Sequence, residues 1–124
     1  MAGKIVADTL EHSTAGSVDT QYVVDGSIKS WVNFTGTGTV TVEDSLNIAS
    51  ITDAGTGIYT VDQTSNFANA NYTITHGGLW AANNGWFHYY NGKSTTGVSL
   101  NFITSAGAAT DSADVSGNFV GDLA

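Results

Sequence analysis

Apolar and polar residues alternate in several short segments of the chain, a two-residue period typical of half-buried β-strands. Val98, Leu100 and Phe102 lie on one side of such a segment, opposite Ser99 and Asn101. Val40 and Val42 are likewise expected on the core face of their strand. We therefore expect antiparallel sheets packed as a sandwich. The predicted strands are Trp31–Phe34, Thr39–Val42, Ile58–Val61, Tyr72–Thr75, Trp86–Tyr90 and Val98–Phe102, with a last strand within Asp114–Leu123.

Turns rich in glycine and asparagine separate these segments. Thr35–Gly38 and Asp53–Gly57 each lie between two apolar runs, which predicts hairpin connections. Asn66–Asn71 is a third predicted connection, with the ring of Phe67 beneath it. Helix signals are weak, because strong helix formers never accumulate at a 3.6-residue period. The Ala-containing segment Ser105–Thr110 is expected to be a loop.

The first 27 residues differ from the rest of the chain. They hold four of the eleven acidic residues and, of the aromatic types Phe, Trp and Tyr, only Tyr22. A segment this poor in large apolar residues buries little surface by itself. We expect residues 1–27 to be an extended arm that orders against a neighbouring subunit or partner, and residues 28–124 to be the sandwich domain. Alternatively, Gln21–Val24 is the first strand of the sandwich.

Composition excludes several classes of function. Three Lys, no Arg and eleven acidic residues give a net charge of -8. Nucleic acids and anionic membranes are therefore not expected partners, because both require clustered basic residues. Charged residues make up 11% of the chain, against about 25% in typical domains. With no Pro and so few charges, exposed strand edges lack the usual protection against edge-to-edge pairing, which favours a homo-oligomer.

Neither disulfides nor membrane-spanning segments are expected. The chain has no Cys, so thiolate metal sites are excluded as well. No apolar window is long enough to cross a bilayer. The first residues lack the apolar core of a signal peptide, which predicts synthesis in a cytoplasm without ordinary secretion.

An aromatic cluster is the sharpest candidate site. On a strand, Trp86, His88 and Tyr90 would share one face, with Phe87 and Tyr89 on the other. An exposed face of this kind could stack sugar rings, with neighbouring asparagine side chains as hydrogen-bonding partners. Burial in a core or an interface is the commoner use of aromatic rings. The candidate contact residues for a carbohydrate or a protein partner are Trp80, Asn83, Asn84, Trp86, His88 and Tyr90.

No metal, cofactor or catalytic site is predicted. The three histidines, His12, His76 and His88, have no recognised ligand spacing. None of the acids near glycine turns (Asp53, Asp62, Asp111 and Asp114) matches a calcium-binding loop. Adjacent Glu43 and Asp44 would point to opposite faces of a strand, so they are a poor glycosidase pair. A nucleophile-elbow motif is also missing. We therefore expect a protein that is not an enzyme.

Four phrases, in order and spacing, resemble a β-rich module that recurs in bacteriophage virion proteins, chiefly tail fibres. The phrases are Ser30–Val40 (SWVNFTGTGTV), Asp44–Asp53 (DSLNIASITD), Gly55–Gly57 with Tyr59–Val61, and Ala70–Tyr72. Together they cover roughly a third of the chain. Thr20–Val24 and Asp114–Asp122 also resemble the lead-in and the closing strand of such proteins.

The resemblance implies a virion component, commonly trimeric and displayed at the particle surface, and made in the bacterial host cytoplasm. The expected fold is all-β, a jelly-roll-like antiparallel sandwich with an extended N-terminal arm, assembled as a homotrimer. The expected function is that of a fibre tip or short spike. The arm would bind another virion protein, and the sandwich could contact a host surface glycan. The alternatives are a capsid decoration or head-fibre protein and a carbohydrate-binding module.

Overall fold

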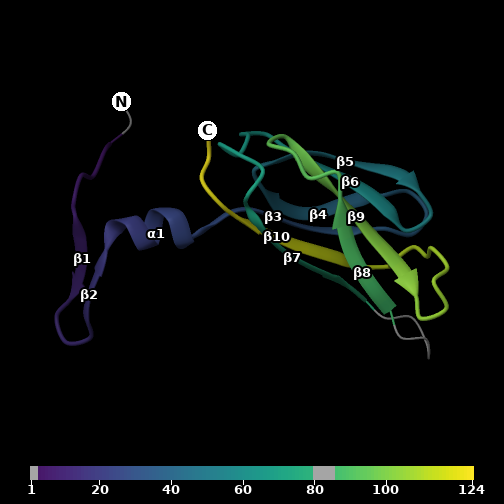
Figure 1. Ribbon diagram of the computed structural model, residues 1–124, viewed down its shortest axis with the longest axis horizontal. Coiled ribbons are helices and arrows are strands. Elements are labelled where there is room, and N and C mark those ends of the chain that lie inside the picture. The colour runs from purple at the N-terminus through teal and green to yellow at the C-terminus, as the bar shows by residue number, and fades with distance from the viewer. Residues whose placement is uncertain (1–2, 80–85) are drawn as a thin grey trace.

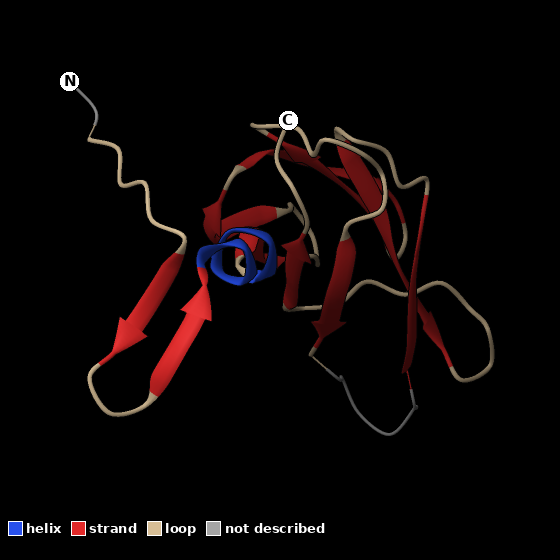
Figure 2. Ribbon diagram, turned by 60° about the vertical axis from the view of Figure 1, so that its left-hand side comes forward, coloured by secondary structure: helices blue, strands red, loops and turns tan. Residues whose placement is uncertain are grey.

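The computed structural model describes residues 3–79 and 86–124 and consists almost entirely of β-strands, with one short helix (Figures 1 and 2). Two strands and the helix, β1 (Thr9–His12), β2 (Gly16–Asp19) and α1 (Thr20–Gly26), form an N-terminal unit. The strands that follow are β3 (Ile28–Thr35), β4 (Thr41–Leu46), β5 (Ile48–Gly55), β6 (Ile58–Gln63), β7 (Thr73–Gly78), β8 (Trp86–Asn91), β9 (Gly97–Thr104) and β10 (Val115–Val120).

The eight strands from β3 to β10 form a sandwich of two four-stranded sheets, with orders β4-β3-β10-β7 and β5-β6-β9-β8. All neighbouring strands are antiparallel. This confirms the expectation of an all-β antiparallel fold. The hairpins predicted at the two Gly-Thr-Gly turns join β3 to β4 and β5 to β6. Assembly as a trimer stays a prediction.

The core lies between the two sheets and is built from alternating residues. In β3 and β6 every second residue is buried, as the two-residue period predicts. Phe34, Tyr59 and Phe102 pack edge to face, with ring centroids 5.2 and 5.9 Å apart. Phe67 lies under the connection before β7 and stacks on Tyr72 at 4.1 Å, as expected for that loop. Each fully buried large side chain contributes about 1.5–3 kcal/mol to stability.

Three local expectations are wrong. Gln21–Val24 belongs to helix α1 and is not a first strand. The strand predicted at Thr39–Val42 begins only at Thr41, and Val42 is exposed, because β4 is an edge strand whose pairing with β3 shifts register after Asn33. Asn101, expected on the solvent face of β9, is 2% exposed, because its partners on the two neighbouring strands, Ile58 and Tyr89, place their side chains on the same face.

The N-terminal unit (residues 3–27) projects from the sandwich (Figure 1). It is a hairpin and a helix, and no residue of it is buried. Within the described residues, no helix has the length and apolar character needed to cross a membrane.

Each sheet has two edge strands, and their arrangement positions the candidate site. β7 ends one sheet and β8 ends the other. Side chains of the two strands meet at this open side of the sandwich, where the rings of His76 and His88 are 4.6 Å apart. At the opposite side, β4 and β5 follow one another directly along the chain.

Candidate functional site

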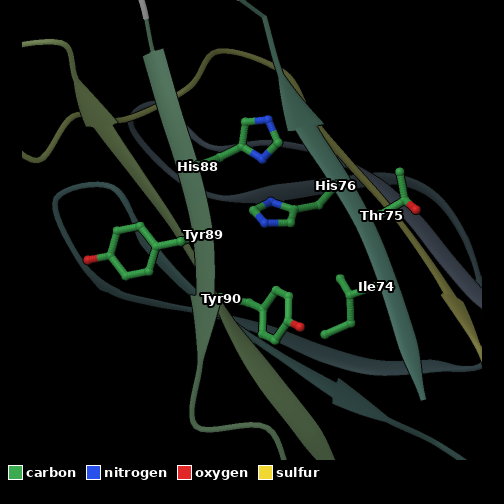
Figure 3. A pocket seen from close by; sticks show the side chains of 6 residues that line it. All are labelled: Ile74, Thr75, His76, His88, Tyr89 and Tyr90. Atoms are coloured by element: carbon green, nitrogen blue, oxygen red, sulfur yellow. The ribbon is translucent and has the colours of Figure 1, made fainter. Parts of the chain in front are cut away.

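A groove of about 430 Å³ lies between β7 and β8, at the open side of the sandwich. The residues that line it are Ile74, Thr75, His76, His88, Tyr89 and Tyr90. Figure 3 shows Ile74 and His76 of β7 directed toward His88 and Tyr90 of β8, whereas Thr75 and Tyr89 point away. This arrangement follows from strand alternation, because residues two apart share a face.

His88 and Tyr90 lie on one face of β8, as the two-residue period of a strand predicts. Trp86 belongs to the same strand, but its side chain lies outside the described part, as do Trp80, Asn83 and Asn84. Phe87 and Tyr89, on the opposite face of β8, are exposed. Stacking of a sugar on the face of His88 and Tyr90 therefore stays a prediction.

His76 lies close to three other rings. Its ring lies 4.6 Å from the ring of His88, 5.6 Å from Phe102 and 6.5 Å from Tyr90. Its Nδ1 atom is buried and has no hydrogen-bond partner among the described residues. Burial, and secondarily the proximity of His88, lowers the pKa of His76 to about 4, so its imidazole is neutral at pH 7.

Lys93 lies next to Tyr90, one of the residues that line the groove. The Lys93 ammonium lies 5.1 Å from the centre of the Tyr72 ring and 5.5 Å from that of Tyr90, and it donates a hydrogen bond to the Tyr72 carbonyl at 3.0 Å. Burial raises the pKa of Tyr72 to about 12, with a further contribution from Tyr90, so the Tyr72 hydroxyl keeps its proton and donates to the Gly97 carbonyl. The lysine thus contacts the rings of both Tyr72 and Tyr90.

Sequence reasoning did not pair His76 with His88. The two residues are on strands of different sheets, and the segment between them includes residues outside the described part. His88 and Tyr90 are two apart on one predicted strand, but the strand predicted at Tyr72–Thr75 ends one residue before His76. Nothing in that pattern, however, states that the inner faces of β7 and β8 meet.

The arrangement lacks the groups of a hydrolytic site. Within residues 3–79 and 86–124, no three His, Cys, Asp or Glu side chains come close enough together to hold a metal ion. The groove lining contains no carboxylate and no serine. It offers two imidazoles and a phenol beside apolar surface.

Comparison of the chain with known proteins gave no relative. No family model matches the sequence, and searches of curated proteins and of solved structures gave no match. The fold and the groove are therefore interpreted from their own geometry and chemistry.

Proposed function

We propose that the protein is a homotrimeric structural component of a bacteriophage virion, a fibre tip or short spike, attached through its N-terminal unit. The proposal rests on the family resemblance of the segment from Ser30 to Tyr72. One structural observation supports its attachment step, namely the exposed apolar surface of the N-terminal unit.

This unit has little to stabilise it in isolation. A two-stranded hairpin is marginal in water, and so is a helix of seven residues. No residue of the unit is buried, and Ile5 is 92% exposed. The apolar side chains of Ile5, Val6, Leu10, Val23 and Val24 nevertheless surround one groove of about 460 Å³. A binding partner that covers this groove would supply the missing apolar contacts.

The charge of the unit indicates the chemistry of its partner. Residues 1–27 hold four acidic side chains, Asp8, Glu11, Asp19 and Asp25, against one lysine, Lys4, which lines the apolar groove. A second copy of the same unit would bring the same excess of negative charge and be repelled. A surface of another virion protein with an apolar strip between Lys or Arg residues fits better.

A matched pair of valines tests the attachment. Val23 in the N-terminal unit is 42% exposed and Val42 on β4 is 41% exposed. We expect Val23→Ser to weaken attachment about tenfold, because burying a valine is worth about 1.5–3 kcal/mol. Val42→Ser should leave attachment unchanged. The measurement is the number of copies per purified particle of the phage that encodes the chain, by quantitative mass spectrometry.

Immunogold labelling of the same particles locates the protein. Label at the tail tip is the expected result. Label confined to the capsid would contradict the spike proposal and support a capsid decoration protein. Particles that lack the protein would contradict a virion role altogether. Equal losses in the two valine variants would show that the N-terminal unit is not the attachment surface.

A further inference from the structure

His76 and His88 face one another across the groove between β7 and β8. Their ring centroids are 4.6 Å apart and their planes are inclined at 74°. Figure 3 shows both imidazoles inside the groove, one above the other, each with a nitrogen turned toward the other ring. The rings come from different sheets, so the packing of the sandwich sets their separation.

The buried nitrogen of His76 needs an explanation. A buried polar atom without a hydrogen bond costs about 1–3 kcal/mol, and native structures contain few of them. The Nδ1 atom of His76 is in this state among the described residues. A neutral imidazole offers the lone pair of one ring nitrogen to a metal ion.

We propose that His76 and His88 together bind one divalent transition-metal ion of the kind that imidazole prefers, namely Zn²⁺, Cu²⁺ or Ni²⁺. An ion between the rings would give His76 the partner that it lacks. At metal–nitrogen distances of about 2.0–2.1 Å, two imidazoles on one metal have centroids roughly 4.5 Å apart for a right angle at the metal and roughly 5.2 Å apart for a tetrahedral one. The observed 4.6 Å corresponds to the right angle, so tetrahedral coordination requires the two rings to separate slightly.

The groove selects for this class of ion. Ca²⁺ and Mg²⁺ require oxygen ligands, and no carboxylate lines the groove. Imidazole nitrogen instead suits Zn²⁺, Cu²⁺ and Ni²⁺. His88 is exposed, so the ion has a path from solvent, and water or an external ligand fills the remaining coordination positions. With two protein ligands, the site binds more weakly than a four-ligand structural zinc site.

The third histidine provides a matched control. His12 lies at the end of β1 in the N-terminal unit, where its Nδ1 atom is within 3.3 Å of the Thr14 amide and 3.2 Å of the Ala15 amide. It has no part in the groove. His12→Gln therefore removes one imidazole from the chain without touching the proposed site.

Isothermal titration of the full chain with Zn²⁺, Cu²⁺ and Ni²⁺ at pH 7.5 tests the site. We expect one ion per chain, and at least a tenfold loss of affinity in both His76→Gln and His88→Gln. His12→Gln should bind as the unchanged chain does, and Ca²⁺ should not compete. Because His88 is exposed, His88→Gln should fold normally, which circular dichroism checks.

Three results would overturn the proposal. The first is the absence of binding by the unchanged chain for all three ions. The second is binding that survives in a folded His88→Gln variant. The third is an equal loss in His12→Gln, which would show that the ions bind isolated histidines on the surface.

Discussion

Gly57 and Gly38 have nearly the same backbone conformation but different surroundings. Their φ angles are +67° and +69°, in the left-handed region that favours glycine. A Cβ atom at Gly57 would lie 2.5 Å from the Phe102 carbonyl and 2.6 Å from that of Thr110, whereas at Gly38 it would meet nothing within 4 Å. The pair thus separates backbone strain from steric exclusion.

We expect Gly57→Ala to lower the free energy of unfolding by about 3 kcal/mol or more, and Gly38→Ala by about 1 kcal/mol. Both variants suffer the left-handed strain, but only Gly57→Ala must also push two backbone carbonyls aside. Urea denaturation measures both. Similar losses of unfolding free energy in the two variants would mean that the Phe102 and Thr110 carbonyls move aside at little energetic cost.

At the level of elements, one buried hydroxyl joins strand β6 to two loops. Tyr59 donates to the Gly36 carbonyl at 2.8 Å, in the turn between β3 and β4, and accepts from the Ser112 amide at 3.2 Å, before β10. Burial is the main cause that raises its pKa, to about 12. Tyr72 makes a simpler contact, a single hydrogen bond to the Gly97 carbonyl at 3.1 Å.

Removal of the Tyr59 hydroxyl should therefore cost more than removal of the Tyr72 hydroxyl. Tyr59→Phe leaves both an amide and a carbonyl without this partner, so we expect a loss of about 2–3 kcal/mol. Tyr72→Phe should lose about 1 kcal/mol. Thermal unfolding at constant pH ranks the two, and a larger loss in Tyr72→Phe would refute a bracing role for Tyr59.

The whole molecule exposes more surface than a compact monomer of its size. A 12.8 kDa monomer exposes about 6,300 Å², and this chain exposes 7532 Å². The projecting N-terminal unit explains why the exposed surface is larger, since the hydrophobic core contains no residue before Val32. The sandwich thus holds all of the buried apolar side chains of the described residues.

Removal of residues 1–27 is expected to leave the free energy of unfolding of the sandwich unchanged within about 0.5 kcal/mol, because no core contact is lost. Denaturant unfolding followed by tryptophan fluorescence measures it. Phe119→Ala in the full chain is the positive control and should lose about 3–5 kcal/mol, since Phe119 is fully buried. A loss above about 1 kcal/mol on truncation would show that the unit braces the sandwich.

Local chemistry explains what could be predicted from the sequence. The buried side of β9 follows from the alternation of Val98, Leu100 and Phe102, and the two hairpins follow from their glycine turns. Each of these signals is local, because the residues that carry it are only a few positions apart in the chain. Helix α1 escaped prediction because its Thr, Val and Gly are weak helix formers.

Contacts between distant strands were decided by the tertiary structure alone. The sequence by itself determined an all-β chain with an N-terminal segment unlike the rest, because residue types and short periods encode strands and turns. It did not determine that β7 and β8 end different sheets at the same open side, which brings His76 to His88. That pairing depends on how two complete sheets pack, and packing between distant segments leaves no local period in the chain.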